Sequence, residues 1–235
     1  MHKRGIFLKI KIGLIFIGIF TFKICLTKFN YFSQHKQDKF VYENFFKKKK
    51  NGVFVDIGAH DGISYSNTLF FEQYLNWTGI CIEPMPSVFS KLVKNRSCIC
   101  VNGCIANFNG KEEFLLISGY SDMLSGLMSH YHQKHIDRID REILLYGGSK
   151  KLIEVDCYKL ETILKKYGIS KIDFLSIDTE GNEFSILQSI DFNCIDIDVI
   201  TVENNYRDKK IRDLLEKNGY DFIRRIRCDE IYKKR

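Results

Sequence analysis

The chain has 235 residues, 45% of them hydrophobic, and a net charge of +7 at pH 7. This length suffices for one sizeable core, since single domains typically run to about 100–200 residues. Residues 1–28 hold six basic side chains and no acid, so the rest of the chain carries a net charge of only +1. No basic stripe with interleaved aromatic residues follows, so we expect no nucleic-acid partner.

An apolar segment near the N-terminus predicts a membrane anchor. Residues 12–22 (IGLIFIGIFTF) are uncharged, and residues 24–26 extend the apolar span beyond Lys23. The span is short for a bilayer, which needs about 20 residues, and resembles the apolar core of a signal peptide. Because no small-residue cleavage site follows, we predict an uncleaved single-pass anchor over 1–28 and a catalytic domain over 29–235. The flanking basic residues favour a luminal or extracytosolic domain only slightly.

The cysteines and histidines suggest two further sites, both disfavoured. Seven cysteines remain outside the anchor, and an odd number fits poorly with a fully paired disulfide framework. A zinc site at the clustered cysteines lacks the paired C-x2-C spacing of structural sites, and the histidine cluster has no neighbouring acid or cysteine to complete a metal site. These clusters are Cys98, Cys100 and Cys104, and His130, His132 and His135.

From residue 53 onward, apolar runs of strand length alternate with segments of helical length. Strands are expected over 53–57, 79–83, 98–102, 153–158, 172–178 and 197–203, with an edge strand over 114–117. Helices are expected over 66–75, 86–95, 160–168 and 211–219, and another passes through Phe184, Leu187 and Ile190. Strand–helix–strand repeats of this kind predict parallel strand pairs.

Two segments depart from the alternation. Residues 118–151 form a polar stretch with glycines at both ends, which we interpret as a long functional insertion. The last two apolar runs, 220–226 and 229–234, are separated by only two residues, which predicts an antiparallel hairpin. The expected fold is therefore α/β and Rossmann-like: a doubly wound, mostly parallel sheet with a C-terminal antiparallel hairpin, preceded by an apolar anchor helix.

Acidic residues and glycines follow the expected strands, where ligands bind in such a sheet. In FVDIGAHDG, Gly58 and Gly62 do not form the G-x-G-x-x-G loop that binds a dinucleotide pyrophosphate. Asp56 and Asp61 flank this loop and would repel a phosphate, whereas a cofactor with an ammonium, a sulfonium and no phosphate would suit it. S-adenosylmethionine is such a cofactor, and Glu83 is placed to accept hydrogen bonds from its ribose hydroxyls.

Four motifs in this order, FVDIGAHDG, SNTLFFE, GICIEP and SIDTEGNE, resemble the FkbM family of S-adenosylmethionine-dependent methyltransferases. The resemblance implies a class I methyltransferase fold, methyl transfer usually to an oxygen, and substrates that are commonly sugars, polysaccharides or other secondary metabolites. It places the following residues at the cofactor, with His60 where the family usually has asparagine: Asp56, Gly58, Ala59, His60, Gly62, Glu83 and Asn102.

The family pattern I-D-x-E-G-x-E carries over to Asp178, Glu180, Gly181 and Glu183. As a mechanistic hypothesis, Asp178 or Glu180 removes or guides the proton of an acceptor hydroxyl while its oxygen attacks the methyl group. Two alternatives are that Glu180 and Glu183 cap the following helix, or that these acids hold a divalent metal.

The predicted function is methylation of a hydroxyl on a glycan or small molecule. The alternative is a non-catalytic, methyltransferase-like membrane protein that binds or escorts a partner. An NAD-dependent enzyme is disfavoured by the missing G-x-G-x-x-G motif.

Overall fold

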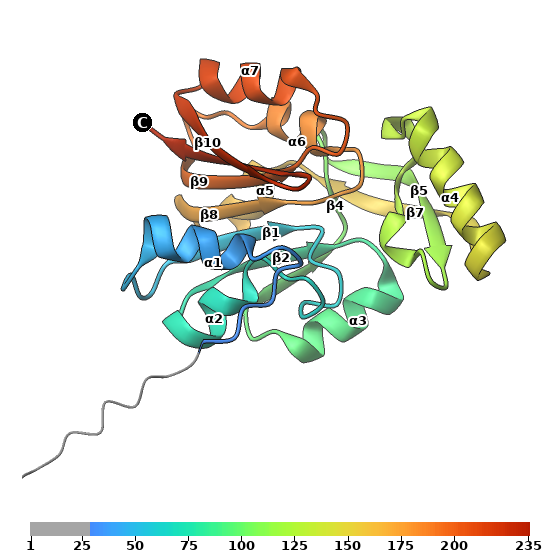
Figure 1. The fold of residues 1–235 in the computed structure, drawn as a ribbon, viewed down its shortest axis with the longest axis horizontal. Helices are drawn as coiled ribbons and strands as arrows, with labels where there is room; N and C mark the ends of the chain where they lie inside the picture. The colour runs from blue at the N-terminus through green and yellow to red at the C-terminus, as the bar shows by residue number, and fades with distance from the viewer. Residues whose placement is uncertain (1–28) are drawn as a thin grey trace, which may run out of the picture.

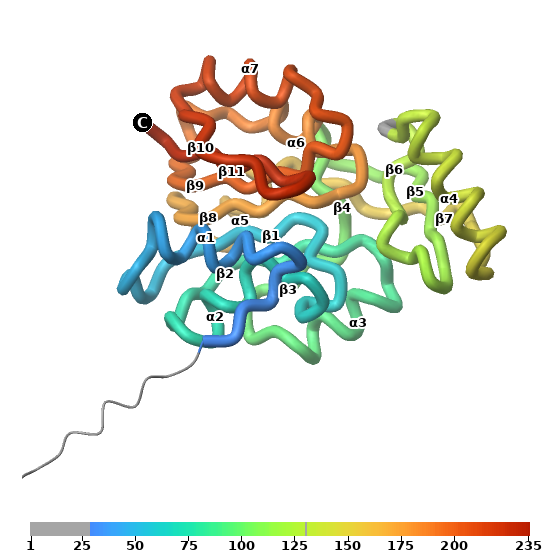
Figure 2. The backbone as a smooth tube through the Cα atoms, viewed as in Figure 1, coloured from blue at the N-terminus to red at the C-terminus, as the bar shows by residue number. Residues whose placement is uncertain are grey.

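The computed structural model describes residues 29–235 as one α/β body with a smaller sheet on one side (Figures 1 and 2). The predicted anchor, residues 1–28, lies outside the described residues. Within residues 29–235, no helix has both the length and the apolar character needed to cross a membrane.

The main sheet has seven strands in the order β10-β11-β9-β8-β1-β2-β3. The five strands from β9 to β3 are parallel to their neighbours, while β11 pairs antiparallel with both β9 and β10. This arrangement confirms the doubly wound sheet and the C-terminal hairpin. The strands are β1 (Val53–Ile57), β2 (Thr78–Glu83), β3 (Ile99–Asn102), β8 (Lys171–Ile177), β9 (Asp196–Glu203), β10 (Tyr220–Ile226) and β11 (Asp229–Lys234).

Helices bury both faces of this sheet, which explains why its strands read as continuous apolar runs. In β1, Phe54 faces one core cluster, whereas Val55 and Ile57 face the other. The cluster around Phe54 includes residues of α1 (Gln37–Val41), a π-helical turn (Tyr42–Phe46), α2 (Leu69–Leu75) and α3 (Pro86–Asn95). The cluster around Val55 includes residues of α5 (Leu160–Lys166), α6 (Glu183–Ser189) and α7 (Lys209–Lys217).

A second sheet follows the order β4-β7-β5-β6 and lies beside the main sheet (Figure 1). Its strands are β4 (Cys104–Ile105), β5 (Gly110–Ser118), β6 (Gly126–Leu127) and β7 (Ser149–Tyr158). One face packs against α3 and Met85, and the other contributes Leu115 and Ile117 to a small core beneath α4 (Gln133–Tyr146). This sheet and its helix lie across from the carboxyl ends of β8 and β9, and the space between them contains the site described below.

Two expectations for this region were wrong. Residues 114–117 are not an edge strand but lie within β5, which pairs with both β6 and β7. Residues 153–158 belong to β7 in the second sheet, not to the parallel sheet. The predicted insertion 118–151 has secondary structure that the sequence did not indicate: it contains β6, the start of β7 and the 14-residue helix α4. Local patterning identifies a strand but not the sheet it joins, and frequent charges hid the apolar stripe of α4.

We expect Ile139→Ala to destabilise the protein by about 2–5 kcal/mol, because Ile139 is fully buried in the small core beneath α4. Urea-induced unfolding followed by circular dichroism would measure this cost. The matched variant Ile139→Val should cost only about 0.5–1.5 kcal/mol. A cost below about 0.5 kcal/mol for the alanine variant would show that α4 does not pack on the second sheet in this way.

Candidate functional site

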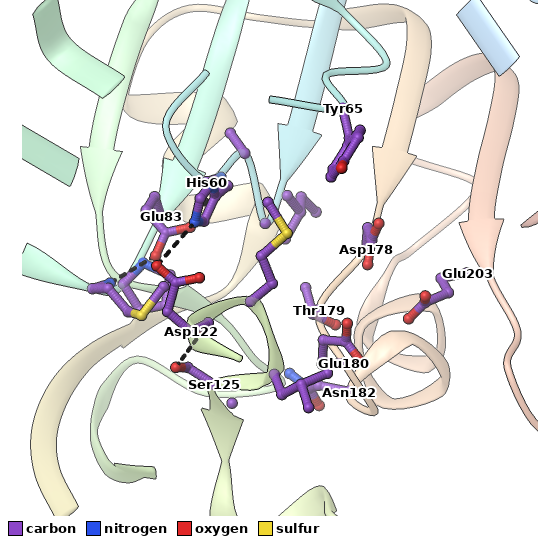
Figure 3. Close-up of a pocket in the computed structure, with 18 of the residues that line it drawn as sticks. His60, Tyr65, Glu83, Asp122, Ser125, Asp178, Thr179, Glu180, Asn182 and Glu203 are labelled. Carbon is purple, nitrogen blue, oxygen red and sulfur yellow. Dashed lines mark hydrogen bonds and ion pairs between the residues drawn. The ribbon is translucent and has the colours of Figure 1, made fainter. Parts of the chain in front are cut away.

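A cavity of about 580 Å³ opens at the carboxyl ends of the parallel strands (Figure 3). It lies where the strand order reverses between β1 and β8, the position at which doubly wound sheets bind ligands. Its size falls within the range of about 300–1,000 Å³ that is common for small-molecule sites. The second sheet and α4 line the opposite side of the cavity.

The glycine loop after β1 passes very close to the end of β8. Gly58 has φ +85°, and a Cβ atom there would lie 1.7 Å from the carbonyl oxygen of Asp178. The backbone N–H groups of Gly58 and Ala59 both donate to the Ile82 carbonyl at 3.0 Å. Only glycine satisfies both the left-handed conformation and the close approach at this position.

Asp56 is the next-to-last residue of β1; it is 4% exposed and lines the cavity. Its Oδ2 accepts a hydrogen bond from Thr68 Oγ1 at 2.6 Å, and Arg96 donates to the same hydroxyl at 3.0 Å. Burial raises the pKa of Asp56, although the Arg96 guanidinium and the Thr68 hydroxyl oppose the shift.

Glu83 ends β2 and holds the glycine loop through its side chain. Its Oε2 accepts from the His60 backbone N–H at 3.1 Å, and its Oε1 accepts from the Met85 N–H at 2.8 Å. Each carboxylate oxygen keeps capacity for another hydrogen bond. Burial raises the pKa of Glu83 to about 7, with a smaller contribution from Asp122 and opposition from the two N–H donors.

His60 lies where the glycine loop meets the turn before β6. Its φ of +47° is in the left-handed region, where asparagine and histidine are both enriched among non-glycine residues. Its Nε2 is 3.8 Å from Asp122 Oδ2, and its Nδ1 is 3.8 Å from Asp61 Oδ1. Both ring nitrogens are buried and have no hydrogen-bond partner within the described part of the chain.

Three carboxylates meet on the opposite wall, as Figure 3 shows. One oxygen from each of Asp178, Glu180 and Glu203 lies within 4.8 Å of the others. Although the Asp178 side chain is exposed to the cavity, desolvation by the surrounding protein and the neighbouring Glu180 raise its pKa well above its usual range. Burial and Asp178 do the same for the pKa of Glu203. Burial also raises the pKa of Glu180 to about 7, against the opposing charge of Arg138. This wall therefore holds protons near neutral pH.

Glu183 has a different position from the other acids of its motif. Its Oε1 accepts from the N–H groups of Thr179 and Gly181 and from the Thr179 hydroxyl, at 2.8–3.0 Å. It thus caps the turn that leads into α6, as the capping alternative predicted for this residue. The acid that completes the three-carboxylate group is Glu203, which comes from the end of β9.

The disfavoured zinc cluster is divided between two sheets. Cys98 and Cys100 adjoin β2, whereas Cys104 pairs in register with Cys157 in the second sheet. Among the side chains that the structure describes, the three-carboxylate group is the one set with the spacing of metal ligands. In the histidine cluster, His135 is buried, and its Nε2 is 3.1 Å from the Leu124 carbonyl.

Helix α4 supplies polar residues that sequence reasoning did not assign to the site. Arg138 and Glu142 line the cavity and are joined by a hydrogen bond of 2.8 Å. Ser121 donates to Glu142 at 2.7 Å, and His135 Nδ1 lies 3.8 Å from Glu180 Oε2. The spacing of 135, 138 and 142 along one helical face was the available signal, but it required the helix itself to be recognised.

The sequence that forms this site matches a known protein family. The family model described as the methyltransferase FkbM domain matches residues 56–222. The chain belongs to the FkbM methyltransferase family. The match extends from Asp56 through the strand-end acids to β10, and it confirms the resemblance inferred from the four motifs.

Among solved structures, the FkbM chain is similar to three bacterial proteins at 13% identity each. One is the methyltransferase FkbM from Methylobacillus flagellatus KT, with a TM-score of 0.44, over 81% of this chain and 46% of that one. A protein in the NADB-Rossmann superfamily from Streptococcus agalactiae gives 0.43, over 85% and 68%. A precorrin-6y C5,15-methyltransferase from Geobacter metallireducens GS-15 gives 0.38, over 74% and 66%.

No curated protein was found to match the chain.

The structure gathers most of the predicted site residues around the cavity. Those that line it are Asp56, Gly58, Ala59, His60, Glu83, Asp178 and Glu180. Gly62 instead faces α3, where an added Cβ would lie 2.6 Å from Arg96 Cγ. Asn102 donates to the carbonyl groups of Glu83 and Pro84, at 2.8 and 3.1 Å, and so braces the end of β2 beside the cavity.

Glu180→Gln should raise the free energy of unfolding of the ligand-free FkbM protein, relative to the wild-type protein, by more at pH 8 than at pH 5. The folded state raises the pKa of Glu180 to about 7, so between about pH 4.5 and 7 it binds more protons than the unfolded chain does. Stability therefore falls as pH rises through this window, and removing the carboxylate recovers up to about 3 kcal/mol. Denaturant titrations of both proteins at the two pH values would measure the difference.

Glu142→Gln is the matched control for this effect. Although partial burial acts in the other direction, hydrogen bonds from Ser121 and Arg138 lower the pKa of Glu142. This variant should therefore lose stability at pH 8 relative to the wild-type protein. Equal responses of the two variants to pH would contradict the proposed difference between their environments.

Proposed function

We propose that this FkbM protein is an S-adenosylmethionine-dependent methyltransferase that methylates a hydroxyl group on a glycan or small molecule. The single observation that carries the proposal is the pair of acidic walls around one cavity at the β1/β8 switch point. Glu83 lies on one wall, and Asp178, Glu180 and Glu203 lie on the other. A cationic cofactor without phosphate suits this charge distribution, whereas a dinucleotide pyrophosphate would be repelled.

The hydrogen-bond acceptors of the cavity fit this cofactor. Both oxygens of Glu83 retain capacity to accept hydrogen bonds, as a ribose with two hydroxyls requires. Asn67 Oδ1 and Asn182 Oδ1 are buried, line the cavity and lack a partner among residues 29–235, so they can accept hydrogen bonds from a polar ligand. Glu83 would hold the ribose, and the glycine loop from Gly58 to His60 would pass beside the cofactor.

Asp178 and Glu180 are the residues we assign to the acceptor. The cofactor supplies an electrophilic methyl group on a sulfonium, so the protein must mainly orient the acceptor oxygen and take up its proton. A carboxylate with a pKa near 7 is suited to this exchange, and Glu180 has such a pKa. Asp178, exposed within the cavity, would orient the hydroxyl towards Glu180 Oε2.

The mouth of the cavity supports a ring-shaped, polar acceptor. Tyr65 and Tyr120 both line it and are 55% and 71% exposed, and Tyr120 packs against Tyr146 with ring centroids 4.4 Å apart. Tyrosine offers an apolar face and a hydroxyl together, which suits a sugar or another hydroxylated ring. Arg138 and Ser125 provide further polar contacts at the side formed by the second sheet.

Calorimetric titration with S-adenosylmethionine and its demethylated product, S-adenosylhomocysteine, tests the proposal. We expect micromolar binding of both by the full-length chain in mild detergent. Glu83→Gln should weaken binding about tenfold to a hundredfold, because hydrogen bonds to a charged acceptor contribute about 1.5–3 kcal/mol. Wild-type affinity should also be about tenfold weaker at pH 6 than at pH 8, since Glu83, with a pKa of about 7, must be ionised to accept.

Glu154→Gln is a suitable control because Glu154 is an exposed acid on β7, paired with Lys111 and outside the cavity. It should leave the affinity unchanged. If a demonstrably folded wild-type protein binds neither compound, the methyltransferase proposal fails, and the alternative of a non-catalytic partner-binding protein gains support. Binding of NAD instead would favour a dinucleotide enzyme.

A further inference from the structure

Two cysteines that the proposed reaction does not use touch each other beneath α2 and α3. Cys81 lies in β2 and is 0% exposed, while Cys98 immediately precedes β3 and is half-buried. Their Sγ atoms are 3.5 Å apart. Because a disulfide has an S–S length of about 2.05 Å, the sulfur atoms need to approach by only about 1.5 Å to form a bond.

A buried cation accompanies this thiol pair. The Arg96 side chain is 0% exposed, and its guanidinium interacts electrostatically with both Cys81 and Cys98. The other charged groups that face it are Glu72, which accepts from Arg96 Nε at 2.7 Å, and Asp56. A buried guanidinium beside a thiol favours the thiolate, which is the reactive form of cysteine.

The surroundings favour the thiolate form at Cys98 rather than at Cys81. Hydrogen bonding with the Cys100 and Cys81 thiols, together with Arg96, lowers the pKa of Cys98 well below its usual range. Burial raises the pKa of Cys81, which solvent does not reach. Cys98 is thus the accessible nucleophile, and Cys81 is the second thiol behind it.

We propose that Cys81 and Cys98 are an oxidisable thiol pair that forms a disulfide between β2 and the segment leading into β3. The co-reactant is a small-molecule disulfide such as oxidised glutathione. The Cys98 thiolate attacks one sulfur of the oxidant and releases the other as a thiol, leaving a mixed disulfide on Cys98. Cys81 then loses its proton, attacks Cys98 Sγ and releases a second small thiol, so two protein thiols are oxidised and one disulfide is reduced.

The bridge would tie together a segment that shapes the cofactor wall. It closes the crossover from Cys81 to Cys98, which contains Glu83 and the whole of α3. Arg96, within this loop, donates to the Gly62 carbonyl at 3.3 Å and to Thr68 Oγ1 at 3.0 Å. Oxidation would therefore restrain Arg96, which holds the glycine loop through these two hydrogen bonds.

A second cysteine pair provides an internal comparison. Cys104 and Cys157 are neighbours in register between β4 and β7, but both are buried. Hydrogen bonding with Cys104 lowers the pKa of Cys157, but Cys157 is 0% exposed, so an oxidant in solution does not reach it as it reaches the half-buried Cys98. We expect this pair to remain reduced under conditions that oxidise Cys81 and Cys98.

The test is to treat the reduced full-length chain with oxidised glutathione, block remaining thiols with N-ethylmaleimide at low pH, and map the cysteines by peptide mass spectrometry. We expect a Cys81–Cys98 linked peptide, with Cys104 and Cys157 blocked as free thiols. The linkage should also form in Cys100→Ser. Recovery of Cys81 as a free thiol, or linked instead to Cys100, would overturn the proposal.

A kinetic measurement on the reduced protein tests the thiolate directly. Iodoacetamide at pH 6.5 should alkylate Cys98 at least tenfold faster than the exposed Cys194, whose pKa is raised by Asp191. In denaturant the two rates should converge. Equal rates in the folded protein would contradict the role assigned to Arg96, whether or not the protein binds S-adenosylmethionine.

Discussion

The contact between the glycine loop and the end of β8 determines the geometry of the site. Gly58 lies so close to the Asp178 carbonyl that no side chain fits, and this closeness joins two motifs more than a hundred residues apart in the chain. The two motifs are neighbours because β1 and β8 pair in parallel, so both strands end at the same edge of the sheet. The cavity forms where the chain then turns away from β1 and β8 in opposite directions.

The crowding of acids around this cavity has a cost that a cationic ligand would offset. Burial raises the pKa values of Asp56, Glu83 and Glu203, so ligand-free protein retains protons that an opposing positive charge would displace. Arg138 is the cation from α4 that faces Glu180 in this wall. The same side chains therefore affect both stability and ligand binding. As the pH rises and they ionise, the ligand-free protein should lose stability, whereas its affinity for a cationic ligand should increase.

Much of the fold followed from local patterning, because the parallel strands β1, β2, β8 and β9 are largely buried and have acids or glycines at or just after their carboxyl ends. The same pattern identified Asp56, Glu83 and Asp178 as neighbours, since parallel strands bring their carboxyl ends together. The second sheet was not predictable in this way. Its longest strand, β7, carries Lys150, Lys151 and Glu154 on a partly solvated surface, and its pairing partners are fixed only by tertiary packing.

Side-chain roles were harder to predict than positions. Glu183 and Glu203 are both acids at the edge of the sheet, but only the first finds backbone N–H groups in the adjacent turn, which draws it away from the cavity. The contributions of Arg138 and Glu142 required knowledge that 133–146 is a helix lying over the site. Gly62 matched the family pattern, but its close neighbours are Leu92 and Arg96 in and beside α3.

The most direct test of the central claim is a crystal structure of the protein with S-adenosylhomocysteine. We predict that the ribose hydroxyls lie within hydrogen-bonding distance of the Glu83 carboxylate, and that the sulfur faces the wall formed by Asp178, Glu180 and Glu203. A ligand bound elsewhere, or bound in this cavity with its ribose away from Glu83, would contradict the account.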